Sequence, residues 1–238
     1  MKWIEYRFDS LPSTQDFLQK KRSEGQNMLA VASVQTTGKG TKGRRFECGE
    51  GGLWLSALVF HENAPAKDAF LMMSRAAVAV CKTLENYGLT PQIKWANDVL
   101  LGRRKVCGIL TENELSGSQI RSTLWGIGLN VNNSLSDKLA PIATTVCKRL
   151  GKPLDLREVE ERLLENLLAP FSFEEYRSRM AYLGEEIPFV IGEQVKYATL
   201  LGVNERGELL LEEDGKTVAY PYGEISFARR SKPNLTRF

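Results

Sequence analysis

Gly38-Lys39-Gly40-Thr41-Lys42-Gly43-Arg44-Arg45-Phe46 decides how the rest of this chain is interpreted. The stretch places four cations and three glycines in nine residues, and none of the nine is acidic. Glycines let backbone N–H groups approach a ligand closely, and lysine and arginine supply positive charge and donors. The stretch therefore predicts a binding site for an anion, and phosphate suits this composition.

The segments on either side of this loop exclude the common nucleotide-binding folds. The glycines fit G-x-G-x-x-G, and 29–34 before them is typical of a strand. A dinucleotide-binding fold needs a helix directly after the glycines, but a Gly-rich turn at 48–52 and a buried strand at 53–60 follow instead. No G-K-[ST] ending of a P-loop is present.

Hydrophobic spacing over the first three quarters of the chain predicts an α+β fold with a mixed or antiparallel sheet flanked by helices. Helices are expected at about 13–25, 65–87, 141–150 and 156–168, and strands at about 29–35, 53–60, 92–100, 106–112 and 120–132. Beyond residue 184, short strands separated by glycine turns predict a small β-barrel. We therefore predict two domains, 1–183 and 184–238.

The composition is that of an ordinary globular protein, and the positive charge gathered in the 38–46 loop indicates a small partner. The 238 residues are 42% hydrophobic and 26% charged, and the net charge of +3 is too slight to indicate nucleic acid. Four scattered cysteines, with His61 as the one histidine, argue against a zinc site or a disulfide framework. No signal peptide or membrane-spanning run is visible, so a cytoplasmic protein without membrane association is expected.

Further polar residues occur within the segment 92–100 and just after it, and each also has a simpler interpretation. Lys94, Asn97 and Asp98 lie where a strand ends and can face a cleft, although an Asn-Asp pair is equally typical of a plain turn. Lys105 precedes an apolar strand and can stabilise an oxyanion, but an exposed hairpin lysine would look the same. These residues indicate a functional site only when they are considered together with the other motifs.

Five segments together, in this order, resemble the biotin–protein ligase family. They are Ser13-Thr14 with Gln35, the loop from Gly38 to Phe46, Lys94 to Asp98, Lys105 through Glu112, and Gly126 to Asn130. The resemblance covers about residues 11–132, and Gly223 to Ser226 is similar to the end of the family's C-terminal domain. It implies a class II synthetase-like catalytic domain followed by a small SH3-like barrel.

The same resemblance implies a two-step ligase. Biotin and ATP with Mg²⁺ would form biotinyl-5′-AMP, and the acyl group would pass to a lysine of a carboxylase's biotin carboxyl carrier protein. Biotin is thus a substrate, and no tightly bound prosthetic group is expected. Because the motifs begin at Ser13, we expect the monofunctional type without an N-terminal DNA-binding domain and without DNA as a partner, and a homodimer is left open.

Site residues are carried over motif by motif. Catalytic roles fall on Lys105, Arg44 and Lys94. Biotin would be held by Ser13, Thr14, Gln15, Gln35, Lys39, Gly40, Thr41, Lys105, Gly108 and Gly126. ATP would be held by Lys42, Arg44, Phe46, Lys94, Asn97, Asp98 and Asn130, and no metal ligand is assigned.

The chain departs from the family pattern at four positions. Lys39 and Thr41 stand where arginines are usual, Phe46 replaces tryptophan and Ala96 replaces proline. Lysine lacks the bidentate fork of arginine, and threonine keeps only a hydroxyl. We therefore predict a looser hold on the adenylate unless Lys42 or Arg45 compensates.

Two other functions remain open at this point. A lipoate or octanoate ligase would share the fold and the carrier-lysine chemistry. A noncatalytic module that binds adenylate or nucleic acid would use the basic loop and the barrel alone.

Overall fold

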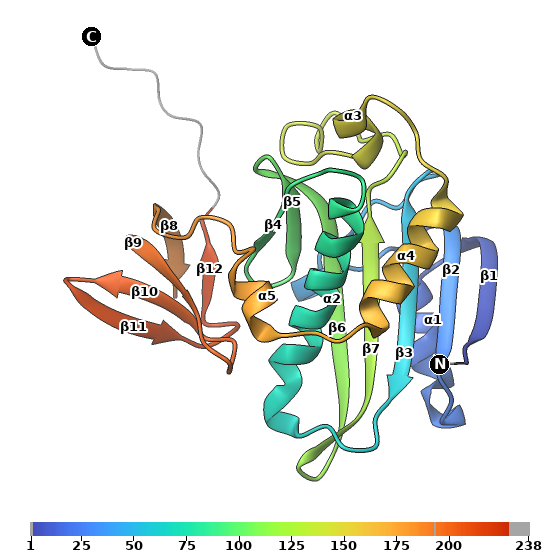
Figure 1. Ribbon diagram of the computed structural model, residues 1–238, viewed down its shortest axis with the longest axis horizontal. Helices are drawn as coiled ribbons and strands as arrows, with labels where there is room; N and C mark the ends of the chain where they lie inside the picture. The colour runs from blue at the N-terminus through green and yellow to red at the C-terminus, as the bar shows by residue number, and fades with distance from the viewer. Residues whose placement is uncertain (1, 193, 229–238) are drawn as a thin grey trace.

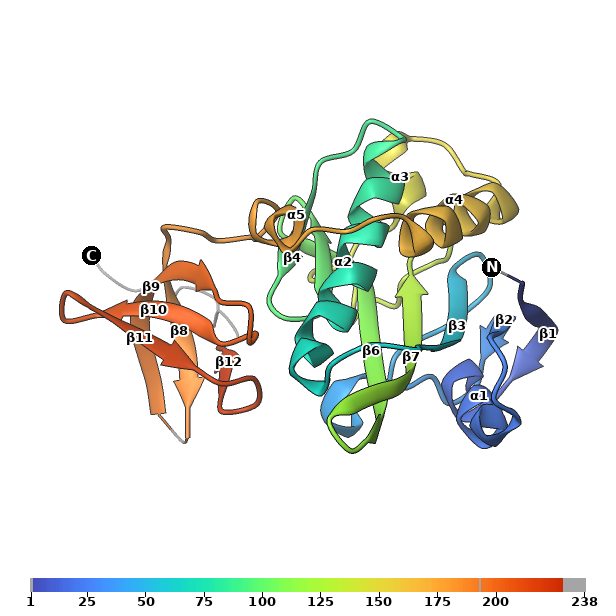
Figure 2. The same ribbon diagram turned by 60° about the horizontal axis from the view of Figure 1, so that its bottom comes forward.

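A computed structural model describes residues 2–192 and 194–228 of the chain, apart from the side chain of Lys42. A large sheet carries helices on both faces, and a smaller sheet lies beside one end of it (Figure 1). Figure 2 shows α2, α3 and α4 on one side of the large sheet and α1 on the other. The predicted α+β class, with a mixed sheet between helices, is confirmed.

The large sheet has seven strands within the described residues, in the order β1-β2-β3-β7-β6-β5-β4. β1 and β2 run parallel, and every other neighbouring pair is antiparallel. The strands are β1 Ile4–Leu11, β2 Met28–Gln35, β3 Leu53–Phe60, β4 Pro91–Lys94, β5 Asp98–Leu101, β6 Arg104–Ser116 and β7 Gln119–Leu129.

The helices form where capping residues and apolar spacing predict them. Ser13 caps α1 by accepting a hydrogen bond from the backbone N–H of Asp16 at 3.2 Å, and Asp155 caps α4 in the same way. The helices are α1 Thr14–Lys21, α2 Ala69–Glu85, α3 Val146–Leu150, α4 Leu156–Leu168 and α5 Phe173–Arg177, with short 3-10 turns at Arg22–Glu24, Thr41–Gly43 and Ala66–Asp68.

The core explains why β3 is apolar along its length. Leu55, Ala57 and Val59 belong to the cluster that packs against α2, whereas Leu58 joins a second cluster beneath α1. A strand covered by helices on both faces has no polar face, so its side chains do not alternate with polar ones. The continuous run Leu53–Phe60 therefore predicted a central strand correctly.

The smaller sheet is antiparallel, with the order β11-β10-β9-β8-β12. Its inward side chains, Phe189, Leu200, Leu209 and Leu211, are buried. It agrees with the predicted C-terminal SH3-like barrel, while the domain boundary near residue 183 stays our proposal. The strands are β8 Glu186–Ile191, β9 Gln194–Val203, β10 Leu209–Glu213, β11 Lys216–Tyr220 and β12 Ile225–Phe227.

Three elements differ from the sequence-based expectation. The edge strand β1 was not predicted, although Ile4, Tyr6 and Phe8 alternate with charged residues in the pattern that is typical of a half-buried strand. The expected strand at 92–100 is two strands, since Lys94 pairs with Asp98 across a turn at 95–97. The short helix α5 was also missed, and it is held by a capping box between Ser172 and Glu175.

Candidate functional site

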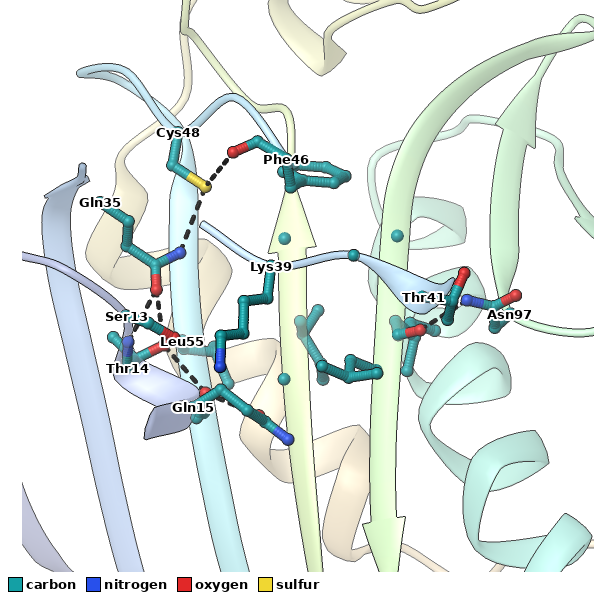
Figure 3. Close-up of a pocket in the computed structure, with 18 of the residues that line it drawn as sticks. Ser13, Thr14, Gln15, Gln35, Lys39, Thr41, Phe46, Cys48, Leu55 and Asn97 are labelled. Carbon is teal, nitrogen blue, oxygen red and sulfur yellow. Dashed lines mark hydrogen bonds between the residues drawn. The ribbon is translucent and has the colours of Figure 1, made fainter. Parts of the chain in front are cut away.

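A single pocket brings together the basic loop, the start of α1 and the middle of strands β3, β6 and β7 (Figure 3). Every residue that the resemblance assigns to biotin lines it. They are Ser13, Thr14, Gln15, Gln35, Lys39, Gly40, Thr41, Lys105, Gly108 and Gly126. The structure thus gathers residues that lie up to about half the chain apart, and their individual roles remain predictions.

One wall of the pocket is a hydrogen-bonded group at the start of α1. The side-chain oxygen of Gln35 accepts from the backbone N–H of Thr14 at 2.7 Å and from its hydroxyl at 3.1 Å. The Thr14 hydroxyl also lies 2.8 Å from the hydroxyl of Ser56. The first N–H groups of a helix have no partner within the helix, so Thr14 is free to fix the amide of Gln35.

Gln15 presents an unsatisfied donor to the pocket. Its side-chain oxygen accepts a bond from the Ser56 hydroxyl at 3.2 Å, but its Nε2 has no hydrogen-bond partner among the described residues. Gln15 is only 4% exposed, and a buried amide without a partner is costly. A bound molecule with an acceptor oxygen at this point would satisfy it.

Gly126 makes the space in which Gln15 lies. A Cβ atom at Gly126 would stand 2.5 Å from Oε1 of Gln15, closer than any carbon and oxygen can pack. The glycine on strand β7 therefore keeps this corner of the pocket open. Any side chain here would move Gln15.

Cys48 joins this wall to the basic loop. Its sulfur accepts a bond from Nε2 of Gln35 at 3.2 Å and donates to the carbonyl of Phe46 at 3.6 Å (Figure 3). Burial raises the pKa of the Cys48 thiol to about 11, against the opposing effect of the Gln35 donor. The group is therefore a neutral thiol at physiological pH, and it acts here as a hydrogen-bonding link.

The basic loop is a tight hairpin. The N–H of Gly40 donates to the carbonyl of Arg44 at 2.7 Å, and the N–H of Phe46 donates to that of Gly38 at 2.9 Å. A Cβ at Gly38 would lie 2.6 Å from the sulfur of Cys48, so the loop can sit against the pocket only with glycine there. Lys39 reaches out to Asp16 on α1, 2.6 Å away.

Phe46 lies on a platform made of two glycines. Gly108 on β6 pairs with Gly128 on β7, and a Cβ at either position would meet the Phe46 ring at 2.8 and 2.9 Å. Nζ of Lys105 lies 5.4 Å from the centre of the same ring. The aromatic ring thus stands between the basic loop and the lysine to which the resemblance gives the main catalytic role.

A cluster of charges adjoins the pocket at the β4–β5 turn. Nζ of Lys105 pairs with Oδ1 of Asp98 at 2.5 Å. Burial lowers the pKa of Lys94, the charge of Asp98 raises it, and Lys105 and Arg44 lower it further. Lys94, Lys105 and Arg44 therefore lie close enough to act on one another, with Asp98 among them.

The residues assigned to ATP are only partly gathered. Phe46 and Asn97 line the pocket, and Nδ2 of Asn97 donates to the carbonyl of Ile109 at 2.7 Å. Asn130 is buried apart from it and accepts a bond from Asn133 at 3.2 Å. Lys94, Asp98 and Arg44 form the adjoining charge cluster, and the side chain of Lys42 lies outside the described part of the structure.

Sequence reasoning missed several residues that line the pocket. Ser56 is a hydroxyl in the otherwise apolar strand β3, which was a usable signal for a polar site. The apolar positions carried no such signal, because core and pocket side chains look alike in sequence. The missed residues are Cys48, Leu55, Ser56, Ile109, Leu110, Ile127 and Gly128.

Residues 2–192 and 194–228 contain neither a metal-binding cluster nor a membrane-spanning helix. No group of three or more His, Cys, Asp or Glu side chains is arranged to hold a metal ion within this part of the chain. No helix in the same part is long and apolar enough to span a bilayer.

Family models match both parts of the chain. Residues 7–132 match the biotin/lipoate A/B protein ligase family, and residues 182–228 match the biotin protein ligase C-terminal domain. The first match spans the whole pocket, from Ser13 to Gly128.

Curated relatives include ligases of two lengths. The chain is 33% identical over 227 residues to the bifunctional ligase/repressor BirA of Bacillus subtilis, covering 86% of this chain and 68% of that protein. It covers 62% of the corresponding protein of Bacillus spizizenii. It is also 29% identical to the biotin–[acetyl-CoA-carboxylase] ligase of Paracoccus denitrificans, over 83% of this chain and 89% of the relative.

A solved structure matches almost the whole molecule. The biotin protein ligase from Aquifex aeolicus, in complex with biotin and ATP, is 31% identical and superposes with a TM-score of 0.73. The match covers 96% of this chain and 99% of the other. With its pocket, its two sheets and these matches, the chain belongs to the biotin/lipoate A/B protein ligase family.

Proposed function

We propose that this protein is an ATP-dependent biotin–protein ligase, which forms biotinyl-5′-AMP and transfers the biotinyl group to a lysine of a carboxylase's carrier protein. The observation that carries the proposal is the position of the buried, unsatisfied amide of Gln15 in a pocket that opens beside the charge cluster of Lys94, Asp98 and Lys105. The names of the relatives from Paracoccus and Aquifex support the same substrates.

The hydrogen-bonding wall suits the ureido ring of biotin. That ring carries one carbonyl acceptor and two N–H donors. The free Nε2 of Gln15 can donate to the carbonyl, and the hydroxyls of Thr14 and Ser56 can accept from the N–H groups. Leu55 and Ile127 line the same pocket and suit the apolar part of the molecule.

The charge cluster suits the first reaction step. A carboxylate oxygen attacks the α-phosphorus of ATP, the new C–O–P bond forms, and the bond to pyrophosphate breaks. Two anions must approach each other, so neutralisation and positioning supply most of the rate enhancement. Lys94, Lys105 and Arg44 can provide that neutralisation, and Lys105 would exchange Asp98 for the reacting oxygens.

The second step transfers the acyl group. The neutral amine of a carrier lysine attacks the acyl carbon of the adenylate, the bond to the phosphate oxygen breaks, and AMP leaves. Negative charge develops on the acyl oxygen as the tetrahedral intermediate forms. Lys105 lies at the junction of pocket and cluster, where its ammonium group would stabilise that oxygen.

Mg²⁺ enters this proposal with the nucleotide. The ion prefers oxygen ligands and usually keeps several waters, with one or two carboxylates and the substrate phosphates completing its shell. Asp98 supplies one carboxylate to the cluster. The ion would shield the charge of the phosphates. Asp98 would supply one ligand to the ion once Lys105 leaves it for the reacting oxygens.

There are two alternatives to a biotin ligase. One is a ligase that activates lipoate or octanoate, and the other is a binding module that catalyses no reaction. The family model spans both biotin and lipoate ligases, whereas the match at 182–228 is to a biotin ligase domain, which favours biotin. A noncatalytic adenylate- or nucleic-acid-binding module would use the same loop without releasing pyrophosphate. A cytoplasmic site of action and the absence of DNA binding remain predictions, and the choice between monomer and homodimer stays open.

Exchange of labelled pyrophosphate into ATP tests the proposal. The protein is incubated with Mg²⁺ and ATP together with biotin, lipoate, octanoate or no acid. Exchange with biotin alone is the expected result. Exchange with lipoate or octanoate in its place would assign the protein to the other branch of the family, and absence of exchange with every acid would leave the binding module.

A further inference from the structure

The turn that carries the charge cluster is enclosed by the C-terminal sheet. Nε1 of Trp95 donates to the carbonyl of Gly207, in the turn before β10, at 3.1 Å. The Trp95 ring also meets the ring of Tyr222 edge to face, with centroids 5.6 Å apart. Two points of the smaller sheet therefore hold the residue next to Lys94, at the end where Figure 2 shows this sheet beside the larger one.

Lys94 itself faces an aromatic ring of the same sheet. Its Nζ lies 5.1 Å from the ring centre of Phe227, on β12. Phe227 is fixed in turn by Phe189 of β8, with ring centroids 5.0 Å apart. Phe189 is fully buried, so the ring that Lys94 faces rests on the core of the smaller sheet.

The opposite side of Lys94 faces the charge cluster. Lys94 lies opposite Asp98 in the register of β4 and β5, and the Asp98 carboxylate forms an ion pair with Lys105 at 2.5 Å. The charges of Lys105 and Arg44 act on Lys94.

We propose that Phe227 positions the ammonium group of Lys94 for the nucleotide, and that Tyr222 holds the β4–β5 turn through Trp95. The inference rests on the proposed function. Phe227 is a positioning residue, because it acts on the nucleotide through Lys94 and does not touch it.

The physical reason lies in the freedom of a lysine side chain. An ammonium group on a four-carbon stem is flexible and strongly hydrated, so a lysine that must meet a phosphate loses conformational entropy on binding. An aromatic face holds the cation in place without neutralising its charge. An acidic side chain would also hold the ammonium group, but it would compete with the phosphate for that positive charge.

Phe227→Leu tests the proposal, because leucine keeps an apolar side chain and removes the aromatic face. In the pyrophosphate-exchange assay the KM for ATP should rise about fivefold, the range that one such contact provides, while the KM for biotin stays within about twofold. Phe227→Tyr, which keeps the ring, should restore the wild-type value. A matched control is Phe171→Leu, since Phe171 faces Arg75 at 5.5 Å in a cation–π contact of the same type away from the cluster.

A double-mutant cycle separates positioning from general stability. Lys94→Met combined with Phe227→Leu should bind ATP no more weakly than Lys94→Met alone, because the ring has no cation left to hold. Additive losses would overturn the proposal, as would an equal rise in both KM values for Phe227→Leu. Wild-type exchange with biotin is measured first, so failure of the proposed function itself is recognised separately.

Tyr222→Leu provides a second variant if Phe227→Leu lowers the folded fraction. Tyr222 is 56% exposed, so its replacement leaves the core of the smaller sheet intact. A smaller rise in the KM for ATP, about twofold to threefold with the KM for biotin unchanged, is expected from the loss of one ring contact. An unchanged KM for ATP in Tyr222→Leu would overturn the role of Tyr222.

Discussion

The wall of the pocket and the charge cluster adjoin each other, but they are held in different ways. Thr14, Gln35 and Ser56 are fixed by hydrogen bonds of 2.7–3.1 Å between two strands and the start of a helix. Lys105 is held by an ion pair to Asp98 and by the face of the Phe46 ring, and the side chains of Lys105 and Asp98 are 34% and 25% exposed. The wall is fixed before a ligand arrives, whereas the cluster can change its partners.

The difference suits the two substrates. Discrimination between small acids needs donors and acceptors at fixed positions, because a misplaced or unpaired buried group weakens binding. Phosphates need charge that can be redirected as bonds form and break. A partly exposed ion pair contributes little to stability, so Lys105 can leave Asp98 at small energetic cost.

Removing the central cation should have the largest effect. Lys105→Ala is expected to lower the rate of pyrophosphate exchange by about 100- to 1,000-fold, the loss typical of one electrostatic group at a reacting centre. Lys216→Ala, at an exposed position on β11, is the control and should leave the rate unchanged. A loss below fivefold for Lys105→Ala would place the catalytic charge elsewhere.

Filling the space beside Gln15 should weaken the binding of biotin and leave the binding of ATP unchanged. In Gly126→Ala the new Cβ would displace Gln15, and the loss of its hydrogen bond to biotin, about 1.4 kcal/mol, predicts a rise of about tenfold in the KM for biotin. The KM for ATP should stay unchanged. Gly49→Ala is the matched control, because a Cβ at Gly49 meets no atom within 4 Å. Equal rises in both KM values would show that wall and cluster are not independent.

Restoring an arginine in the basic loop should tighten the hold on the intermediate. Thr41 lines the pocket where the family resemblance leads us to expect arginine. Thr41→Arg adds charge-assisted donors, and we expect about tenfold slower release of biotinyl-5′-AMP in a chase experiment without carrier. Equal release rates for the two proteins would mean that the loop already holds the adenylate through other residues.

The smallest expected effect is a pH dependence of ATP binding. Burial lowers the pKa of Lys94 below the ordinary lysine value of 10.5, so this side chain loses its proton earlier than an exposed lysine as pH rises. The neutral form cannot balance a phosphate charge. The KM for ATP should therefore rise as the pH approaches 10.5, and the rise should begin below the range in which an exposed lysine loses its proton. Lys94→Arg should flatten that rise, and an identical slope in both proteins would remove Lys94 from the ATP site.

The sequence predicted the cluster and the pocket from different kinds of signal. The glycines and cations at 38–46 and the Ser13 cap could be interpreted directly, because their chemistry depends on few neighbours. The Gln15–Gly126 contact and the link through Cys48 could not be predicted, since both depend on strand register between distant segments. The Asn97-Asp98 pair was recognised as typical of a turn, but the division of 92–100 into two strands was not predicted, because its apolar flanks are typical of one strand.

The most direct test of the account is transfer of biotin to a carrier. The protein is incubated with biotin, ATP, Mg²⁺ and an unmodified biotin carrier domain, beside the same domain with its acceptor lysine replaced by arginine, and the intact masses are measured. We predict the gain of one biotinyl group by the first domain and none by the second, and no gain by either with Lys105→Ala. An unmodified carrier in the presence of wild-type protein would contradict the assignment as a biotin–protein ligase.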